Sequence, residues 1–401
     1  MARFLFITWD GGGTVPPAFG IAQALRERGH EAVFAGQELM PATDAAGAGR
    51  GRLEARAAAH GFRFARLERS SAAWLKESPE RRIVTAVMAS QEHLGDLPDA
   101  VAREGCDVLV IDGLMFGALA AAEGTDLPVA VLVTSAPSAT AAPGGPLDTR
   151  LLAAVNEVRA VARRAAIDRL WDAWARFPTL CATIPELDPL ADQVPPSFAY
   201  VGPVFERVPI SGWRPPWPRD DPRPLALVSF TTTGGWDQTS RIQRTLAALA
   251  DGPYRVLVTA GRAAAAGFVV PGNAVLVPHV PHGEVLPQTS VVITHAGHGT
   301  VAAALAHGVP LVCLPNPGTD QPALAARVED LGAGQALNGE AASPGEIKHA
   351  VDDVLAGPLY AAAAGRLARA IAAAPGAATA ASRLEPLVRR PHLPPSPAPA
   401  R

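Results

Sequence analysis

The sequence predicts an α/β protein of two doubly wound, Rossmann-like domains, each built on a parallel sheet, which face each other across a cleft. Three observations support this prediction. Short apolar runs alternate with amphipathic segments along most of the chain. The stretch 208–222 interrupts this alternation with five prolines, which neither a helix nor a central strand tolerates. The length of 401 residues suits two domains of roughly 100–200 residues each.

The first alternating series opens with a strand at 4–9, a glycine turn at 11–13 and a helix that ends near 28. A strand at 31–35 completes a βαβ unit, which requires parallel strands. Further strands are expected at 62–67, 107–111 and 129–133. Helices are expected at 79–94, 118–123 and 150–176, the last as one helix or a bent pair. Residues 136–147 are rich in Ala, Pro, Gly and Ser and are expected to form a mobile loop.

The second alternating series follows the proline-rich stretch. Its expected strands are 225–230, 255–259, 274–277, 291–294 and 311–314. Its expected helices are 240–250, 300–307, 321–330, 344–355 and 359–374. The predicted division is an N-terminal domain of residues 1–207, a linker of residues 208–222, a C-terminal domain of residues 223–375, a helical segment at 376–389 and a disordered tail at 390–401.

Composition narrows the classes of function. Lys and Arg total 35 against 38 for Asp and Glu, a net charge of −3, which argues against a nucleic-acid partner. No stretch of about 18 apolar residues runs unbroken, so no membrane insertion is expected, and the apolar N-terminal run is too short for a signal peptide. The three cysteines are far apart and form no CxxC pair, so neither a disulfide framework nor a thiolate zinc site is expected. We expect a cytoplasmic protein.

The most informative segment follows the expected strand at 291–294. It begins with His295 and continues with Gly297, His298, Gly299 and Thr300 into a helix. Free N–H groups and the dipole at a helix start favour an anion, and glycines let a ligand approach the backbone closely. Thr300 can cap the helix or donate to a phosphate oxygen. The alternative is an ordinary strand-to-helix turn in which His298 is a solvated loop residue.

A second polar pair, Asp320 and Gln321, stands after the next expected strand, where another helix begins. A carboxylate and an amide at this position can bind neighbouring hydroxyl groups of a sugar. The alternative for Asp320 is a simple helix cap, which is common for aspartate.

Together these motifs resemble the donor signature of family 1 glycosyltransferases, which have the two-domain GT-B fold and use nucleotide-activated sugars. The resemblance is strongest to bacterial natural-product members and spans residues 3 to about 385. It rests on His295-x-Gly297-x-Gly299-Thr300, Gly308-Val309-Pro310, Pro315, Asp320-Gln321, Gly332-x-Gly334, and the segments 13–17, 28–31, 228–232 and 280–287.

The resemblance implies a role for each matched position on the donor side. His295 and the amides of Gly297, His298, Gly299 and Thr300 would hold the diphosphate, with Thr232 as a further candidate. His279 stands where relatives place the aromatic residue that stacks on the nucleobase, and the backbone of Val280 would pair with the base edge. Asp320 and Gln321 would bind the sugar. The helical segment at 376–389 would cross back to the N-terminal domain.

The resemblance also implies the reaction and its partners. The sequence contains no Asp-x-Asp pair, in agreement with a metal-independent, inverting transfer in one step. A dTDP- or UDP-sugar would be the co-substrate, with no separate cofactor and no metal. The N-terminal domain would bind a small apolar acceptor, for which Trp9 and Gly13 are candidate contacts. A monomer or homodimer is expected.

One position departs from the family pattern. The family's general base is a histidine, but Thr14 stands there, while Asp112 matches the aspartate that orients this histidine. A threonine hydroxyl is no base near pH 7. The acceptor could instead be an acidic, carbon or nitrogen nucleophile. Another residue could be the base, with Asp10, His93 and Asp112 as candidates, although a helical His93 is more often solvated or part of the core. The third alternative is an inactive homologue that binds a nucleotide or a partner protein.

Overall fold

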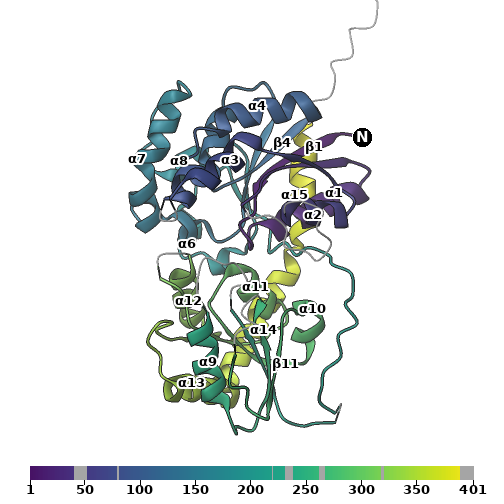
Figure 1. The fold of residues 1–401 in the computed structure, drawn as a ribbon, viewed down its shortest axis with the longest axis vertical. Coiled ribbons are helices and arrows are strands. Elements are labelled where there is room, and N and C mark those ends of the chain that lie inside the picture. Colours follow the sequence, from purple (N-terminus) through teal and green to yellow (C-terminus); the bar gives the residue numbers. More distant parts are fainter. Residues whose placement is uncertain are drawn as a thin grey trace, which may run out of the picture.

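Two parallel sheets, each flanked by helices, form two domains stacked one above the other (Figure 1). The computed structural model describes residues 1–39, 52–78, 81–218, 220–230, 238–261, 267–317 and 320–388. Within these ranges no helix has the length and the apolar character needed to cross a membrane. The predicted tail at 390–401 lies outside the described residues.

The N-terminal sheet has seven parallel strands in the order β3-β2-β1-β4-β5-β6-β7. The strand order reverses between β1 and β4, and ligands of doubly wound sheets bind at the carboxyl ends of the strands at such a point. Trp9 ends β1 and Asp112 ends β4, so both residues lie there. The strands are β1 (Arg3–Trp9), β2 (Glu31–Gln37), β3 (Arg63–Arg66), β4 (Val108–Asp112), β5 (Val129–Val133), β6 (Thr179–Cys181) and β7 (Phe198–Tyr200).

Helices cover both faces of this sheet because its strands are apolar on both sides. Along β1, Leu5 and Ile7 belong to one buried cluster, while Phe4 and Phe6 belong to the cluster on the opposite face. The helices are α1 (Val15–Glu27), α2 (Arg52–Ala59), α3 (Glu68–Lys76), the π-helix η1 (Ile83–Met88), α4 (His93–Glu104), α5 (Phe116–Ala122), α6 (Pro137–Ala141), α7 (Pro146–Val161), α8 (Leu170–Trp174) and the 3₁₀ turns η2 (Pro185–Leu187) and η3 (Ala191–Gln193).

The C-terminal sheet has six parallel strands in the order β10-β9-β8-β11-β12-β13, with its reversal between β8 and β11. The strands are β8 (Leu225–Ser229), β9 (Arg255–Thr259), β10 (Ala274–Val277), β11 (Thr289–Thr294), β12 (Leu311–Cys313) and β13 (Gly334–Ala336). The helices are α9 (Thr239–Leu249), α10 (His282–Val285), η5 (Leu286–Gln288), α11 (His298–Ala306), α12 (Gln321–Asp330), α13 (Pro344–Ala356), α14 (Pro358–Ala373), α15 (Gly376–Leu384) and η6 (Glu385–Leu387).

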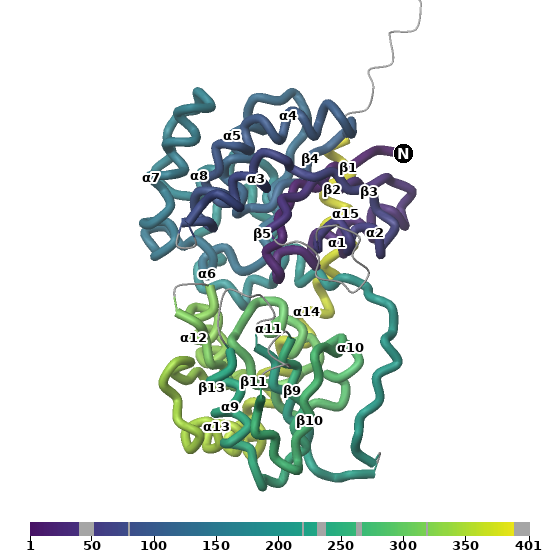
Figure 2. Tube along the Cα trace, in the orientation of Figure 1, coloured from purple at the N-terminus to yellow at the C-terminus, as the bar shows by residue number. Residues whose placement is uncertain are grey.

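The end of the described chain returns from the lower to the upper domain (Figure 2). Helix α14 packs on the core of the C-terminal domain, whereas α15 buries Ala380 and Leu384 in the N-terminal core against α1. The returning segment lies directly on the chain that leaves the N-terminal sheet. A Cβ at Gly202, which has a φ of 91°, would collide with the carbonyl oxygen of Ala374. This close backbone approach requires glycine.

Two expectations, a helix at 79–94 and a loop at 136–147, were wrong. The helix expected at 79–94, whose first two residues lie outside the described ranges, is instead the π-helix η1, a break, and α4 from His93. The amide of Gln37, from β2, donates to the carbonyl oxygen of Ala86 at 2.6 Å and thereby supports this irregular turn.

The loop expected at 136–147 contains helix α6 and the start of α7, and the segment expected as a helix or bent pair at 150–176 is α7 and α8. Pro137 and Pro146 each stand in a first helical turn, where proline is compatible with a helix.

Candidate active site

Three buried polar atoms converge at the strand reversal of the N-terminal domain. They are Nε1 of Trp9, Oγ1 of Thr14 and Oδ2 of Asp112, and none of them has a hydrogen-bond partner among the described residues. Thr14 precedes α1 but does not cap it with its side chain. The indole of Trp9 lies across Gly11, where a Cβ would meet both the ring and the hydroxyl of Thr14. The fold therefore brings Trp9, Thr14 and Asp112 together at the carboxyl edge of the sheet.

The carboxyl group of Asp112 is poised to exchange a proton. Its Oδ1 accepts a hydrogen bond of 2.9 Å from the N–H of Leu114. Burial raises the pKa of Asp112 to about 7, and the nearby Leu114 N–H, Trp9 indole and Thr14 hydroxyl only partly oppose this rise. Such a carboxylate can act as a general base near neutral pH.

The other two base candidates make other contacts, although Nδ1 of the buried His93 also has no hydrogen-bond partner among the described residues. Asp10 is buried and pairs with Arg52 through both carboxylate oxygens, with Oδ1 2.6 Å from Nη2; burial raises its pKa, and Arg52 opposes the rise. His93 begins α4 as a core residue, with Nε2 3.3 Å from Oε1 of Gln37. Burial lowers the pKa of His93 to about 4. The expected acceptor contact Gly13 is exposed with open space around its Cα.

A candidate anion site lies at the strand reversal of the C-terminal domain. Gly297 stands before the first residue of α11 with no side-chain cap, and its carbonyl accepts from the N–H groups of Thr300 and Val301. The first N–H groups of the helix, at His298 and Gly299, have no partner within the helix. A Cβ at Gly297 would collide with Nε2 of His295, so the imidazole lies across the helix start.

His295 is neutral at physiological pH. Burial lowers its pKa to about 4, with a further contribution from the positive charge of Arg241. A neutral imidazole can donate one hydrogen bond to a phosphate oxygen while the helix start supplies the positive potential. Ala296, which links His295 to the helix, has a φ of 63°, a left-handed conformation that is strained for alanine.

The side chain of His298 faces the other domain. Its Nε2 lies 2.9 Å from Oγ1 of Thr183, which follows β6 in the N-terminal domain, and burial lowers its pKa to about 4. The alternative of a solvated loop residue is therefore wrong. Because the side chain contacts Thr183, the group of His298 that can bind an anion is its backbone N–H.

Asp320 and Gln321 begin α12 beside this helix start. The hydroxyl of Ser135, from the N-terminal domain, donates to Oδ2 of Asp320 at 3.0 Å. Burial raises the pKa of Asp320, and this hydrogen bond opposes the rise. The helix-cap alternative fails because the Asp320 side chain does not cap α12. Oε1 of Gln321 accepts from the backbone and side-chain N–H groups of Asn316, both at 3.0 Å.

The remaining donor-side candidates differ in exposure. His279 follows β10 and is exposed, so its ring is free to stack on a ligand. Val280 is buried in the core of the C-terminal domain. Thr232 lies outside the described residues. Their roles in nucleotide binding stay predictions.

Residues that the sequence analysis missed connect the domains. Ser135 and Thr183 follow strand ends of the N-terminal sheet, and the backbone oxygen of Glu186 accepts from Nε of Arg327 at 2.7 Å. Ser135 stands two residues after the apolar run that forms β5, which places it at the carboxyl edge of the sheet. This position could have identified Ser135 as a candidate site residue from the sequence. Its contact with Asp320 in the other domain could not be inferred from the sequence.

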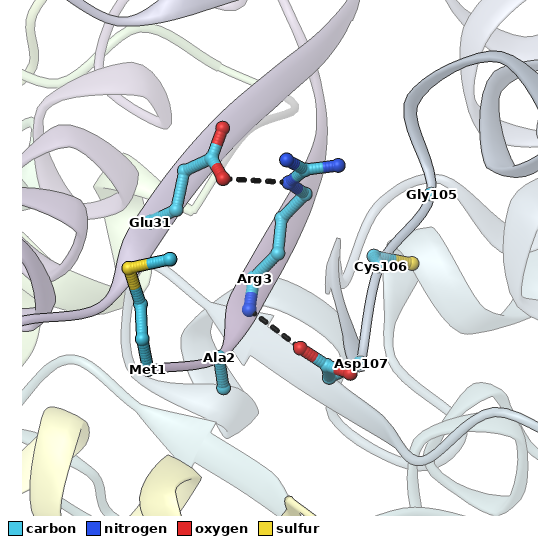
Figure 3. Close-up of a pocket in the computed structure, with 7 residues that line it drawn as sticks. All are labelled: Met1, Ala2, Arg3, Glu31, Gly105, Cys106 and Asp107. Atoms are coloured by element: carbon cyan, nitrogen blue, oxygen red, sulfur yellow. Dashed lines mark hydrogen bonds and ion pairs between the residues drawn. The ribbon is translucent and has the colours of Figure 1, made fainter.

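Among the cavities that the described residues line, two in the N-terminal domain bear on the site. One, of about 250 Å³, opens at the amino ends of the strands around Arg3, Glu31 and Asp107, at the edge of the sheet opposite to Asp112 (Figure 3). Arg3 pairs with Glu31 at 2.7 Å, and its backbone N–H donates to Asp107, so these side chains are engaged in structural contacts. The other cavity, of about 650 Å³, lies between α3, η1 and α7 and has the size of a small-molecule site.

Comparison with known proteins concerns the fold and the class of enzyme. Residues 243–387 match the model of the C-terminal domain of erythromycin biosynthesis protein CIII-like proteins. The chain is 29% identical to 4'-demethylrebeccamycin synthase of Lentzea aerocolonigenes, over 96% of this chain and 100% of that protein. It is 28% identical to demethyllactenocin mycarosyltransferase of Streptomyces fradiae, over 86% and 77%. The crystal structure of the calicheamicin glycosyltransferase CalG4 matches with a TM-score of 0.76 at 23% identity, over 98% and 100%.

Proposed function

We infer that this chain, a glycosyltransferase with the GT-B fold, transfers a sugar from a dTDP- or UDP-sugar to a small natural-product acceptor. The observation that carries the proposal is the pair of opposed sites. An uncapped helix start with His295 across it suits a diphosphate, and Asp112 lies at the corresponding strand reversal of the other domain. The contact of Ser135 with Asp320 supports a shared site between the domains.

The donor would bind the C-terminal domain, residues 223–375. The neutral His295 and the N–H groups of His298 and Gly299 would hold the diphosphate. Asp320 and Gln321 would accept hydroxyl groups of the sugar. We propose that these groups, without a divalent cation, stabilise the diphosphate as it leaves with the electron pair of its bond to the anomeric carbon.

Asp112 would be the general base that the family pattern assigns to a histidine. In one inverting displacement, the acceptor oxygen or nitrogen attacks the anomeric carbon while Oδ2 of Asp112 takes its proton. Two features support this role. Oδ2 has no hydrogen-bond partner among the described residues, and burial raises the pKa of Asp112 to about 7. A base in this position also favours catalysis over the alternative of an inactive nucleotide-binding homologue.

The acceptor would use the cavity between α3, η1 and α7. Its lining combines small apolar side chains with charged ones, which suits a compact molecule that carries both apolar and polar groups. The apolar side chains are those of Ala73, Val84, Ala89 and Ala154, and the charged ones are those of Glu77, Arg81, Glu92, Arg150 and Glu157. Gln37 connects this cavity to the strand ends where Asp112 lies. Its side-chain amide donates to the carbonyl oxygen of Ala86 in η1, and its backbone stands opposite Trp9 in the pairing of β1 with β2.

Calorimetric titration with UDP and dTDP in the presence of EDTA tests the donor site. We expect wild type to bind one of them at micromolar affinity and His295→Ala to lose this affinity. His307→Ala is a matched control, because His307 is exposed at the other end of the same helix. If wild type binds neither nucleotide, or if His295→Ala binds as tightly as wild type, the proposed donor site is wrong.

A further inference from the structure

Arg241 is a buried cation without an acidic partner. It stands in the first turn of α9 with 6% of its surface exposed. Nε donates to the carbonyl oxygen of Gly339 at 3.0 Å, and Nη1 donates to Oε1 of Gln238 at 2.8 Å. Both acceptors are neutral. No carboxylate among the described residues lies within ion-pair distance. Glu340 attracts the charge from farther away, and the guanidinium lies over the ring of Phe230, with 5.5 Å between Cζ and the ring centroid.

Among the described residues, a second deeply buried arginine forms an ion pair, as expected for a buried charge. Arg159 is 1% exposed, and its Nη1 lies 2.5 Å from a carboxylate oxygen of Glu123. A cation in the protein interior is costly unless an anion compensates it. Arg241 therefore keeps an unfavourable charge that a bound anion would stabilise.

The position of Arg241 points to the anion. Helix α9 follows β8, which pairs with β11, the strand that leads into His295. A hydrogen-bonded chain runs from Arg241 through Gln238 to Oδ1 of Asn316 at 3.4 Å, and from Asn316 to Gln321. This chain connects Arg241 to the start of α12. It is also close enough to contribute to the low pKa of His295.

We propose that Arg241 supplies the positive charge against which the diphosphate of the nucleotide sugar binds and leaves. This inference rests on the proposed function and adds a cation to the amides and the imidazole. A carboxylate paired with Arg241 would neutralise it before the ligand arrives, and none of the described residues forms such a pair, so the positive potential of this region is preserved. The competing explanation is structural: Arg241 serves only to hydrogen-bond Gly339 and Gln238 and so to stabilise the fold.

The experiment compares Arg241→Gln and Arg241→Lys with Arg244→Gln. Arg244 is a matched control because it lies on the same helix and also donates to Gly339, at 2.9 Å. Affinities for UDP, UMP, dTDP and dTMP are measured by calorimetry. We expect Arg241→Gln to weaken the diphosphate that wild type prefers roughly 10- to 100-fold and its monophosphate less, since the lost interaction is with charge. Arg244→Gln should stay within about twofold.

Arg241→Lys separates charge from geometry. Lysine keeps the charge but cannot reproduce both hydrogen bonds of the guanidinium. If charge matters, this variant retains most of the diphosphate affinity; if the role is structural, it loses as much as Arg241→Gln. If Arg241→Gln fails to fold, the diphosphate affinity of Arg241→Lys relative to wild type still distinguishes a role of the charge from a structural role.

The pKa of His295, followed by NMR, is an independent readout. Removing the neighbouring charge in Arg241→Gln should raise this pKa. Equal loss of monophosphate and diphosphate affinity, or no loss, would overturn the inference while leaving the proposed function intact. Absence of nucleotide binding by wild type would instead overturn the proposed function.

Discussion

Replacement of Asp112 by asparagine should lower activity and raise stability at the same time. Asparagine keeps an oxygen for the N–H of Leu114, so the fold of the strand end is preserved. It cannot accept a proton from the acceptor. Because general base catalysis contributes roughly 10²- to 10⁴-fold, we expect kcat to fall by this factor with alcohol acceptors.

The effect on stability follows from the pKa of Asp112, which burial raises from 3.8 to about 7. The folded state therefore holds a proton that the unfolded state loses between these pH values, so the free energy of unfolding of wild type falls as pH rises through this window. The full difference corresponds to roughly 4 kcal/mol. Asp112→Asn lacks this loss, so it should exceed wild type in stability by up to about 4 kcal/mol above pH 7 and match it near pH 4.

Urea denaturation at pH 5, 6, 7 and 8 measures the stability difference, and steady-state kinetics at the same pH values measures activity. For wild type, kcat should rise with pH through about 7 as Asp112 ionises. If Asp112→Asn kept kcat within about threefold of wild type, another group would be the base. A stability difference independent of pH would show that Asp112 does not titrate in this range.

Three further predictions concern the neighbouring contacts. Thr14→His should raise kcat with alcohol acceptors, because an imidazole there could pair with Asp112; a pH–rate profile checks this, and no gain in kcat would contradict it. Ser135→Ala should raise the KM for the donor about threefold to tenfold, because Asp320 loses its hydrogen bond across the domains; KM unchanged in steady-state kinetics would show that the contact does not serve the donor site. Leu384→Ala should lower the free energy of unfolding by about 2–5 kcal/mol, because Leu384 is fully buried where α15 packs on the N-terminal domain; urea denaturation measures it, and a change below about 1 kcal/mol would mean that this packing adds little stability.

The local features of the site were accessible from the sequence. The apolar strand before His295 and the glycines after it predicted a strand, an open turn and a helix start, which β11 and α11 confirm. The fold class was predicted for the same reason: alternation of apolar runs with amphipathic segments is a local property of the chain. The substitution of Thr14 for the family's histidine could also be identified from the sequence alone.

Other features depend on residues that are far apart in the sequence. The turn at η1 is supported by Gln37, from a strand 49 residues away. Ser135 and Asp320 are 185 positions apart, and no periodicity predicts their hydrogen bond. The helix α6 appeared as a loop because proline and glycine mark both loops and helix starts, and only packing distinguishes them.

Residue identity and spacing determined which chemical groups stand at the strand ends of this protein. Tertiary structure decided what those groups can do, because burial sets their charge and neighbours set their hydrogen bonds. Burial gives Asp112 a pKa of about 7, and no carboxylate of the described residues comes close enough to Arg241 to form an ion pair with it. Neither property is encoded in a short motif, since each depends on how much water and which side chains the fold leaves around one group.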